Sequence, residues 1–144
     1  MLTLKDVHEA FDLTGPFGLL PNSFIGGSYV VKGLEAADID IVVPLFDCDV
    51  TKLEAAGFEQ YRFESEDPKY AEALNDPLNR LVFTFRRGNL NLIVINNDYL
   101  PAYRGAVAAM AADPDRYAER DDRVRLHVQA CTLLKQLATG ELLN

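Results

Sequence analysis

Apolar residues recur at helical spacing in the first segment of the chain and then gather in short runs between turns. A helix is predicted over residues 4–12, where Thr3 is a suitable N-cap. Its apolar face consists of Leu4, Val7, Ala10 and Phe11. Glycines and prolines end this helix and lead into shorter elements. These are a strand at 24–25, a helix at 29–34, a strand at 38–43, a loop at 44–48, a helix at 49–56 and a strand at 58–63.

The second half of the chain is predicted to contain a β-hairpin and two longer helices. Residues 64–78 are acidic and include two prolines, which indicates a long loop. Two strongly apolar runs, at 80–86 and 90–95, flank a turn near residues 87–89. The remaining elements are a helix from Tyr99 or Pro101 to Ala111, a break at Asp113-Pro114 and a last helix over about 121–138. The apolar stripe of that last helix consists of Val124, His127, Val128, Cys131, Leu134 and Leu137.

This order of elements predicts an α+β fold, in which a mixed β-sheet packs against helices. The chain has 144 residues, which is the size of one domain. It contains no internal repeat and no linker long enough to separate two domains. We therefore expect one domain over residues 1–144 with a short helical C-terminus.

The composition is that of an ordinary globular protein with an acidic surface. The formal net charge is −8, and Lys and Arg are interleaved with acids in segments such as 116–123. A protein that grips nucleic acid through its phosphates normally carries a basic face, so nonspecific nucleic-acid binding is not expected. No apolar run reaches the ~18 residues of a membrane-spanning helix, and no membrane segment is expected. Cys48 and Cys131 form no cluster, and we expect buried thiols in a reducing cytoplasm.

Two short motifs carry the candidate chemistry. Gly26-Gly27-Ser28 follows the strand at 24–25, and glycines there allow a ligand to approach the backbone closely. Backbone N–H groups at the start of the next helix can bind phosphate. Asp38 and Asp40 lie at alternate positions of a strand, so their side chains project from the same face. Two carboxylates on one face suit Mg²⁺ in the company of a triphosphate.

Together these motifs resemble the signature of the nucleotidyltransferase fold family, Gly-Gly/Ser followed by Asp-x-Asp on the next strand. Nine residues separate Ser28 from Asp38. The resemblance covers about residues 20–98, with 99–144 as a helical appendage. It implies a protein that binds an NTP with Mg²⁺ or Mn²⁺ and transfers a nucleotidyl group to an unknown acceptor. In that interpretation Asp38 and Asp40 bind the metal.

The resemblance also implies roles for the residues near the glycine turn. The expected nucleotide-binding residues are Gly26, Gly27, Ser28 and Lys32. Arg86 and Arg87, at the end of the hairpin, are weaker candidates for binding phosphate.

The family's third acid is replaced by an amide. The position that aligns with it is Asn91, in the strand at 90–95. An amide can offer a carbonyl oxygen to a metal, but it cannot act as a general base. Loss of a general base costs on the order of 10²–10⁴ in rate. Asp38, Asp40 and Asn91 are therefore the candidate catalytic residues, and metal and nucleotide binding are expected to be better preserved than catalysis.

Other interpretations remain open from the sequence. Gly26-Gly27 can be an ordinary tight turn, and Asp38-Ile39-Asp40 an exposed strand face. His8 and His127 are interpreted as surface or packed histidines. The alternative function is a catalytically inactive member of this fold that binds a host or partner protein. A third alternative is the antitoxin-like role that small members of this family play beside a helical toxin, which would supply the missing surface. The small size also resembles that of nucleotidyltransferase-like proteins of bacteriophages, and a cytoplasmic location is expected.

Overall fold

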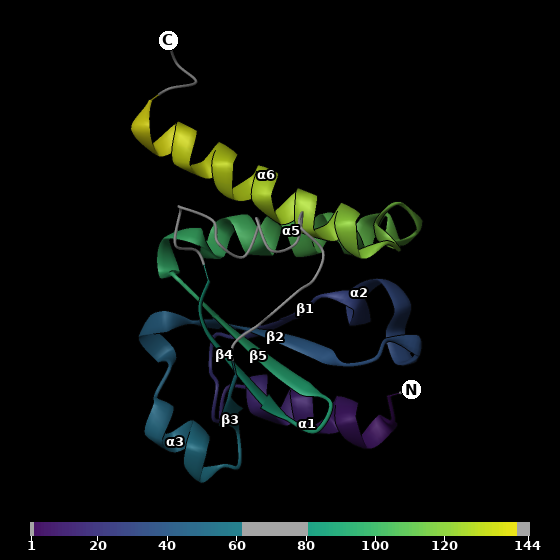
Figure 1. The fold of residues 1–144 in the computed structure, drawn as a ribbon, viewed down its shortest axis with the longest axis vertical. Helices are drawn as coiled ribbons and strands as arrows, with labels where there is room; N and C mark the ends of the chain where they lie inside the picture. The colour runs from purple at the N-terminus through teal and green to yellow at the C-terminus, as the bar shows by residue number, and fades with distance from the viewer. Residues whose placement is uncertain (1, 62–80, 141–144) are drawn as a thin grey trace.

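The computed structural model describes residues 2–61 and 81–140. The predicted loop at 64–78 and parts of the predicted strands at 58–63 and 80–86 lie outside these residues. Five helices, joined by short 3-10 turns, surround one β-sheet in the described residues (Figure 1). The described helices are α1 (Leu4–Thr14), α2 (Ser28–Lys32), α3 (Val50–Ala55), α5 (Leu100–Ala112) and α6 (Arg120–Thr139).

The sheet has five strands in the order β1-β2-β5-β4-β3 and is mixed, as the sequence predicted. The strands are β1 (Phe24–Gly26), β2 (Ile39–Pro44), β3 (Glu59–Gln60), β4 (Leu81–Arg87) and β5 (Leu90–Ile95). The central pair, β2 and β5, is parallel, and the other neighbouring pairs are antiparallel. The predicted hairpin is confirmed, with Gly88 and Asn89 as its turn. The α+β fold class is therefore confirmed.

Each face of the sheet packs against its own set of helices. Figure 1 shows α1 and α3 on one side of the sheet and α5 and α6 on the other. The larger apolar core lies on the α1 side, where alternate residues of the two central strands are buried. These residues are Ile39, Ile41 and Val43 of β2 and Leu90, Leu92 and Val94 of β5. The smaller core, on the α5 side, includes Val42, Ile95, Ala102, Tyr103 and Cys131.

The first helix buries a narrower face than the sequence predicted. Thr3 caps α1 and forms a capping box with Asp6, as expected of an N-cap residue. Val7 and Ala10 are buried against the sheet. Leu4 and Phe11, which share the predicted apolar face, are 67% and 58% exposed.

The last helix packs at one end and projects at the other. The helix α6 extends past the end of α5, as Figure 1 shows. Cys131 is fully buried and Leu134 is partly buried against the smaller core. Leu137, on the same predicted apolar stripe, is 53% exposed because it lies in the projecting part.

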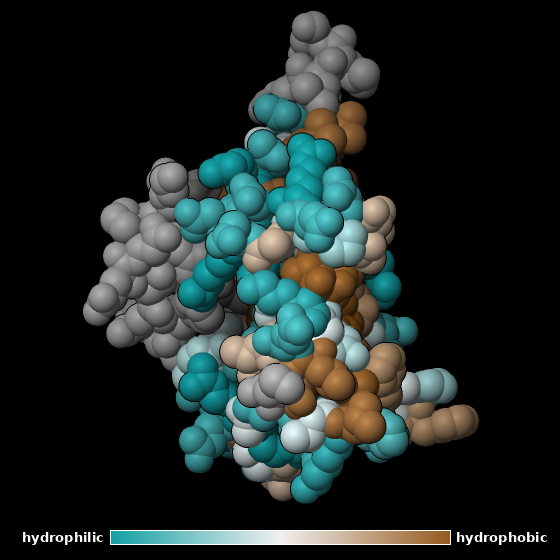
Figure 2. All heavy atoms as spheres, turned by 90° about the vertical axis from the view of Figure 1, so that its right-hand side faces the viewer, coloured by the Kyte–Doolittle hydropathy of each residue, from teal (hydrophilic) through white to brown (hydrophobic). Residues whose placement is uncertain are grey.

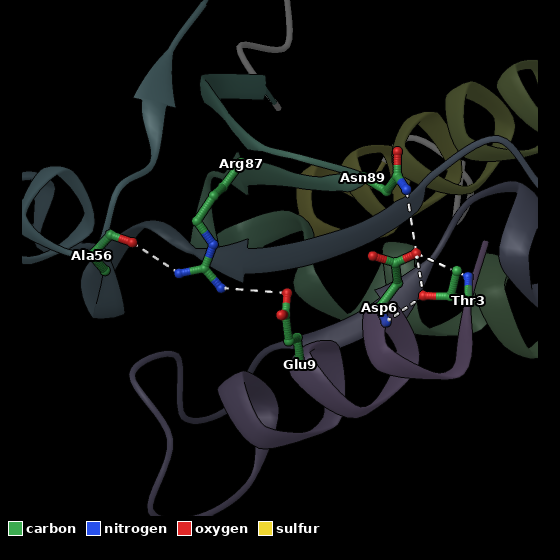
Figure 3. A network of polar contacts seen from close by, with 6 residues as sticks. All are labelled: Thr3, Asp6, Glu9, Ala56, Arg87 and Asn89. Carbon is green, nitrogen blue, oxygen red and sulfur yellow. Dashed lines mark hydrogen bonds and ion pairs between the residues drawn. The ribbon is translucent and has the colours of Figure 1, made fainter. Parts of the chain in front are cut away.

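A polar network ties α1 to the hairpin and to α3 (Figure 3). Asn89, in the hairpin turn, donates a 3.3 Å hydrogen bond to Asp6. Arg87 donates a 2.8 Å hydrogen bond to the carbonyl oxygen of Ala56 and lies 3.9 Å from the carboxylate of Glu9. The tip of the hairpin is thus fixed against the elements on the α1 side.

Within the described residues, none of the helices has the length and apolar character needed to cross a membrane.

The core on the α1 side is expected to dominate stability. Replacing the fully buried Leu92 by Ala should lower the free energy of unfolding by about 2–5 kcal/mol, because it removes packed atoms and leaves a cavity. The same replacement at the exposed Leu137 should change it by less than about 0.5 kcal/mol. Urea unfolding of both variants measures the difference, and equal losses would show that the core is misassigned.

Candidate functional site

Asp38 and Asp40 lie at the start of β2, on the face of the sheet that carries α5 and α6. The strand begins at Ile39, so Asp38 immediately precedes it rather than forming its first residue. Asn91 of β5 donates from Nδ2 to Asp38 Oδ2 at 2.7 Å and to Asp40 Oδ1 at 3.3 Å. Both carboxylates therefore converge on one nitrogen atom, which places them on the same side of the sheet.

The glycine turn lies directly against the second aspartate. The antiparallel pairing of β1 and β2 places Gly26 opposite Asp40. A Cβ atom on Gly27 would lie only 2.1 Å from Asp40 Oδ2, and Gly27 has a φ of +66°. Residue 27 must therefore be glycine both for its backbone conformation and for the space that the carboxylate occupies. The two halves of the sequence motif are in contact.

The other predicted residues of the glycine segment differ in their positions. Ser28 is the first residue of α2 and is partly exposed beside Gly27. Gly26 is buried, and a Cβ atom there would lie 3.3 Å from Val107 of α5, so this glycine serves close packing. Lys32 is exposed at the opposite end of α2 from Ser28. Within the described residues, Lys32 forms no hydrogen bond or ion pair with either aspartate.

Asn91 is buried, with 7% of its surface exposed, and its amide has a defined orientation. Arg86 Nε, which can only donate, lies 3.3 Å from Asn91 Oδ1. The amide nitrogen consequently faces the two aspartates. This differs from the sequence prediction, in which the carbonyl oxygen of Asn91 was available to a metal, because that oxygen already accepts a hydrogen bond from Arg86.

The two carboxylates of the site repel each other in a partly desolvated environment. Burial and the neighbouring charge of Asp38 raise the pKa of Asp40 from 3.8 to about 7. The hydrogen bond from Asn91 and the positive charges of Arg123 and Arg120 act in the opposite direction. Added positive charge would therefore be stabilised at this position.

The two arginines from α6 were missed by the sequence analysis. Arg123 donates hydrogen bonds of 2.9 and 2.8 Å to the carbonyl oxygens of Tyr117 and Ala118, which hold it at the start of α6. That end of α6 follows a 3-10 turn, Pro114–Tyr117, which contacts α2. The alternating charges of residues 116–123 indicated a solvated surface, and only the fold brings two of these arginines toward Asp40.

The site suits a divalent cation that receives its remaining ligands from water and from a phosphate. Asp38 and Asp40 offer hard oxygen ligands on one side, and their mutual repulsion is the kind that a cation relieves. Among the described residues, no group of three or more His, Cys, Asp or Glu side chains could hold a metal. Mg²⁺ often binds through one or two carboxylates, with water and phosphate oxygens completing its octahedron. The donor set therefore matches Mg²⁺ or Mn²⁺ bound together with a phosphate ligand.

The other singled-out side chains serve packing. Arg87 lies on the α1 face with its guanidinium 4.5 Å from the centre of the Phe58 ring, so it is not placed to assist the aspartates. His127 packs against the buried ring of Tyr103 at a centroid distance of 4.6 Å. His8 is exposed.

An apolar hollow lies beside the site but does not include it. Figure 2 shows apolar side chains grouped on the side of the molecule that carries α2. An open hollow of about 480 Å³ is lined there by Phe11, Thr14, Phe24, Ile25, Tyr29, Val30 and Gly33. Neither aspartate lines this hollow, so it does not contribute to the acidic site.

Substitution of Gly27 tests the contact with Asp40. Gly27→Ala should lower the free energy of unfolding by about 2–4 kcal/mol, because it adds a steric clash to the ~1 kcal/mol cost of a positive φ. Gly33→Ala is the matched control, since Gly33 has nearly the same backbone conformation (φ +59°, ψ −135°) as Gly27 (φ +66°, ψ −156°) but open space where a Cβ would lie. Similar losses for both variants, measured by urea unfolding, would mean that Asp40 does not occupy the space at Gly27.

The raised pKa of Asp40 predicts a pH dependence of stability. The folded state binds the Asp40 proton more tightly than the unfolded state, so the stability of the wild type falls as pH rises from about 4 to about 7. Asp40→Asn removes this proton-linked loss. The variant should therefore gain stability relative to the wild type across that range, as measured by denaturation at several pH values. A constant difference between the two proteins would contradict the assignment.

Comparisons with protein-family models, with curated proteins and with solved structures returned no match to this chain.

Proposed function

We propose that this chain is a nucleotidyltransferase-like protein that binds an NTP together with Mg²⁺ or Mn²⁺. The observation that carries the proposal is the contact of Asp40 with Gly27, at a point where Asp38 and Asp40 converge on one face of the sheet. Two carboxylates beside a glycine turn offer both a cation site and a backbone that a phosphate can approach.

The chain's own residues account for the remaining requirements of triphosphate binding. Ser28 offers a hydroxyl group at the turn, and Gly27 leaves the backbone accessible. Arg120 and Arg123 add positive charge on the side of α6. This charge compensates the negative charge of phosphate oxygens that would lie beside the two carboxylates. When bound, the divalent cation supplies further positive charge to the phosphate oxygens.

Nucleotidyl transfer is the reaction that this arrangement favours. A hydroxyl oxygen of the acceptor forms a bond to the α-phosphorus, the bond from that phosphorus to the β-phosphate oxygen breaks, and pyrophosphate leaves. The hydroxyl proton passes to a base. Asn91, in the place of the third carboxylate, cannot accept it, so the proton goes to solvent or to a group on the acceptor, and the reaction is slow.

A second candidate function is a catalytically inactive protein of this fold that binds a host or partner protein. The orientation of Asn91 favours it, because the amide donates to both aspartates and stabilises them without a metal. The two candidates differ in whether a nucleotide binds in a metal-dependent manner.

Thermal unfolding with each of the four NTPs distinguishes the two candidates. At a hundred times its Kd, a bound NTP with Mg²⁺ should stabilise the wild type by about 2.7 kcal/mol. Asp38→Asn combined with Asp40→Asn should abolish this stabilisation, whereas Asp12→Asn, at an exposed position of α1, should retain it. Absence of Mg²⁺-dependent stabilisation by every NTP would reject nucleotide binding and support the inactive candidate.

If an NTP binds, transfer is measured with α-labelled NTPs and a cell lysate as the source of acceptor. Label should appear on an acceptor with the wild type and not with the Asp38→Asn/Asp40→Asn variant. Asn91→Asp restores a carboxylate at this position and should increase the rate, by less than the 10²–10⁴-fold of a free general base because Arg86 lies beside the new carboxylate.

A further inference from the structure

Three neighbouring strands place Arg86, Asn91 and Asp40 in one row across the sheet. Arg86 of β4 is paired with Asn91 of β5, and Asn91 is paired with Asp40 of β2. Paired residues point to the same face, so all three side chains lie on the side that carries the candidate site. Adjacent strands are about 4.8 Å apart, which places the backbone of Arg86 roughly 10 Å from that of Asp40.

The Arg86 side chain has a defined place beside the acids. Its Nε donates to Asn91 Oδ1 at 3.3 Å, and its guanidinium lies 4.7 Å from the centre of the Tyr61 ring. The pKa of the Tyr61 hydroxyl is raised mainly by burial, and Arg86, Asp40 and Asp38 all act on it. The guanidinium and the two carboxylates are therefore near the same phenol. The hydrogen bonds of Arg86 to Asn91 and to the Tyr61 hydroxyl engage only part of the five N–H donors of an arginine.

A second divalent cation does not suit the position of Asn91. Such an ion needs an oxygen ligand there, but Asn91 presents an NH₂ group to the aspartates and its oxygen to Arg86. It would also lie beside the positive charge of the guanidinium, and the described residues hold no third carboxylate there to compensate both charges. The described side chains therefore provide ligands for one divalent ion, at Asp38 and Asp40.

We propose, as an extension of the proposed function, that Arg86 takes the place of a second metal ion in this site. One divalent cation binds at Asp38 and Asp40 with the phosphates of the NTP. The Arg86 guanidinium provides the other positive charge and donates hydrogen bonds to a phosphate oxygen of the same NTP. Asn91 is a positioning residue, because it holds the Arg86 side chain on one side and the two carboxylates on the other.

The number of bound Mn²⁺ ions tests this proposal without measuring activity. The probe is the α,β-methylene analogue of whichever NTP binds most tightly, at saturation, with Mn²⁺ counted by electron paramagnetic resonance. The wild type should bind one Mn²⁺ per protein-bound nucleotide. Asn91→Asp should still bind one, because the new carboxylate pairs with Arg86. Arg86→Met combined with Asn91→Asp should bind two, because the guanidinium no longer compensates the charge of the three carboxylates.

Nucleotide affinity gives an independent measurement on the same samples. Arg86→Met should weaken binding of the analogue by about 10–100-fold, as expected for loss of a charge-assisted hydrogen bond. Lys52→Met removes the same charge from an exposed position of α3, on the opposite side of the sheet, and should leave the affinity unchanged. An equal effect of both variants would show that only net charge matters and would overturn the role of Arg86.

The outcomes separate this proposal from the proposed function. Two Mn²⁺ ions per wild-type chain would show that Arg86 does not take the place of a second metal ion. Metal-dependent nucleotide binding would remain supported. One Mn²⁺ in the Arg86→Met/Asn91→Asp variant would also overturn the role of Arg86, since the guanidinium would not be what excludes the second ion. Failure of the wild type to bind the analogue in the presence of Mn²⁺ would reject the proposed function itself.

Discussion

The carboxylate of Asp40 fills the space that a side chain at residue 27 would need, and the candidate site is arranged around this contact. The pairing of β1 with β2 places the glycine turn over the acid, while the pairing of β2 with β5 places Asn91 beside it. Burial raises the pKa of Asp40, and repulsion from the neighbouring carboxylate of Asp38 raises it further. Asn91 and the arginines of α6 offset these two effects only in part. The site is therefore suited to take up additional positive charge.

The alternation of side chains along the strands lets one sheet serve two purposes. Ile39, Ile41 and Leu92 face α1 and form the core, whereas Asp40 and Asn91 face the other side. The same rule separates two consecutive arginines. Arg87 secures the hairpin against α1 and α3, and Arg86 reaches Asn91 beside the acids. The larger core and the candidate chemistry thus lie on opposite faces of the sheet, while the smaller core shares the face of the candidate site.

Local patterns were sufficient to predict the fold class and the placement of the acids. The alternation around Ile39 put Asp38 and Asp40 on one face, and the apolar runs around a glycine turn indicated the hairpin. Long-range contacts were not predictable in this way. The contribution of Arg120 and Arg123 depends on where α6 begins relative to the sheet, which their alternating local charges do not reveal. The orientation of the Asn91 amide depends on its cross-strand partner Arg86.

Helix periodicity was a weaker guide to burial than strand alternation. Leu4 and Phe11 share the helical spacing of Val7 and Ala10, but the sheet covers only the middle of that face, so both are exposed. Leu137 is exposed for a different reason, because α6 continues beyond the elements that cover it. Periodicity shows which residues share a face, and the dimensions of the neighbouring element decide how much of that face is buried.

Binding of a divalent cation by Asp38 and Asp40 beside the glycine turn, as proposed, is open to a direct measurement. Paramagnetic broadening of backbone amide resonances by small amounts of Mn²⁺, added together with a saturating NTP, locates the ion directly. The amides of Gly27, Asp40 and Asn91 should broaden first, and those of α3 should broaden last. Broadening centred elsewhere on the protein, or none that depends on Asp38 and Asp40, would contradict this binding site.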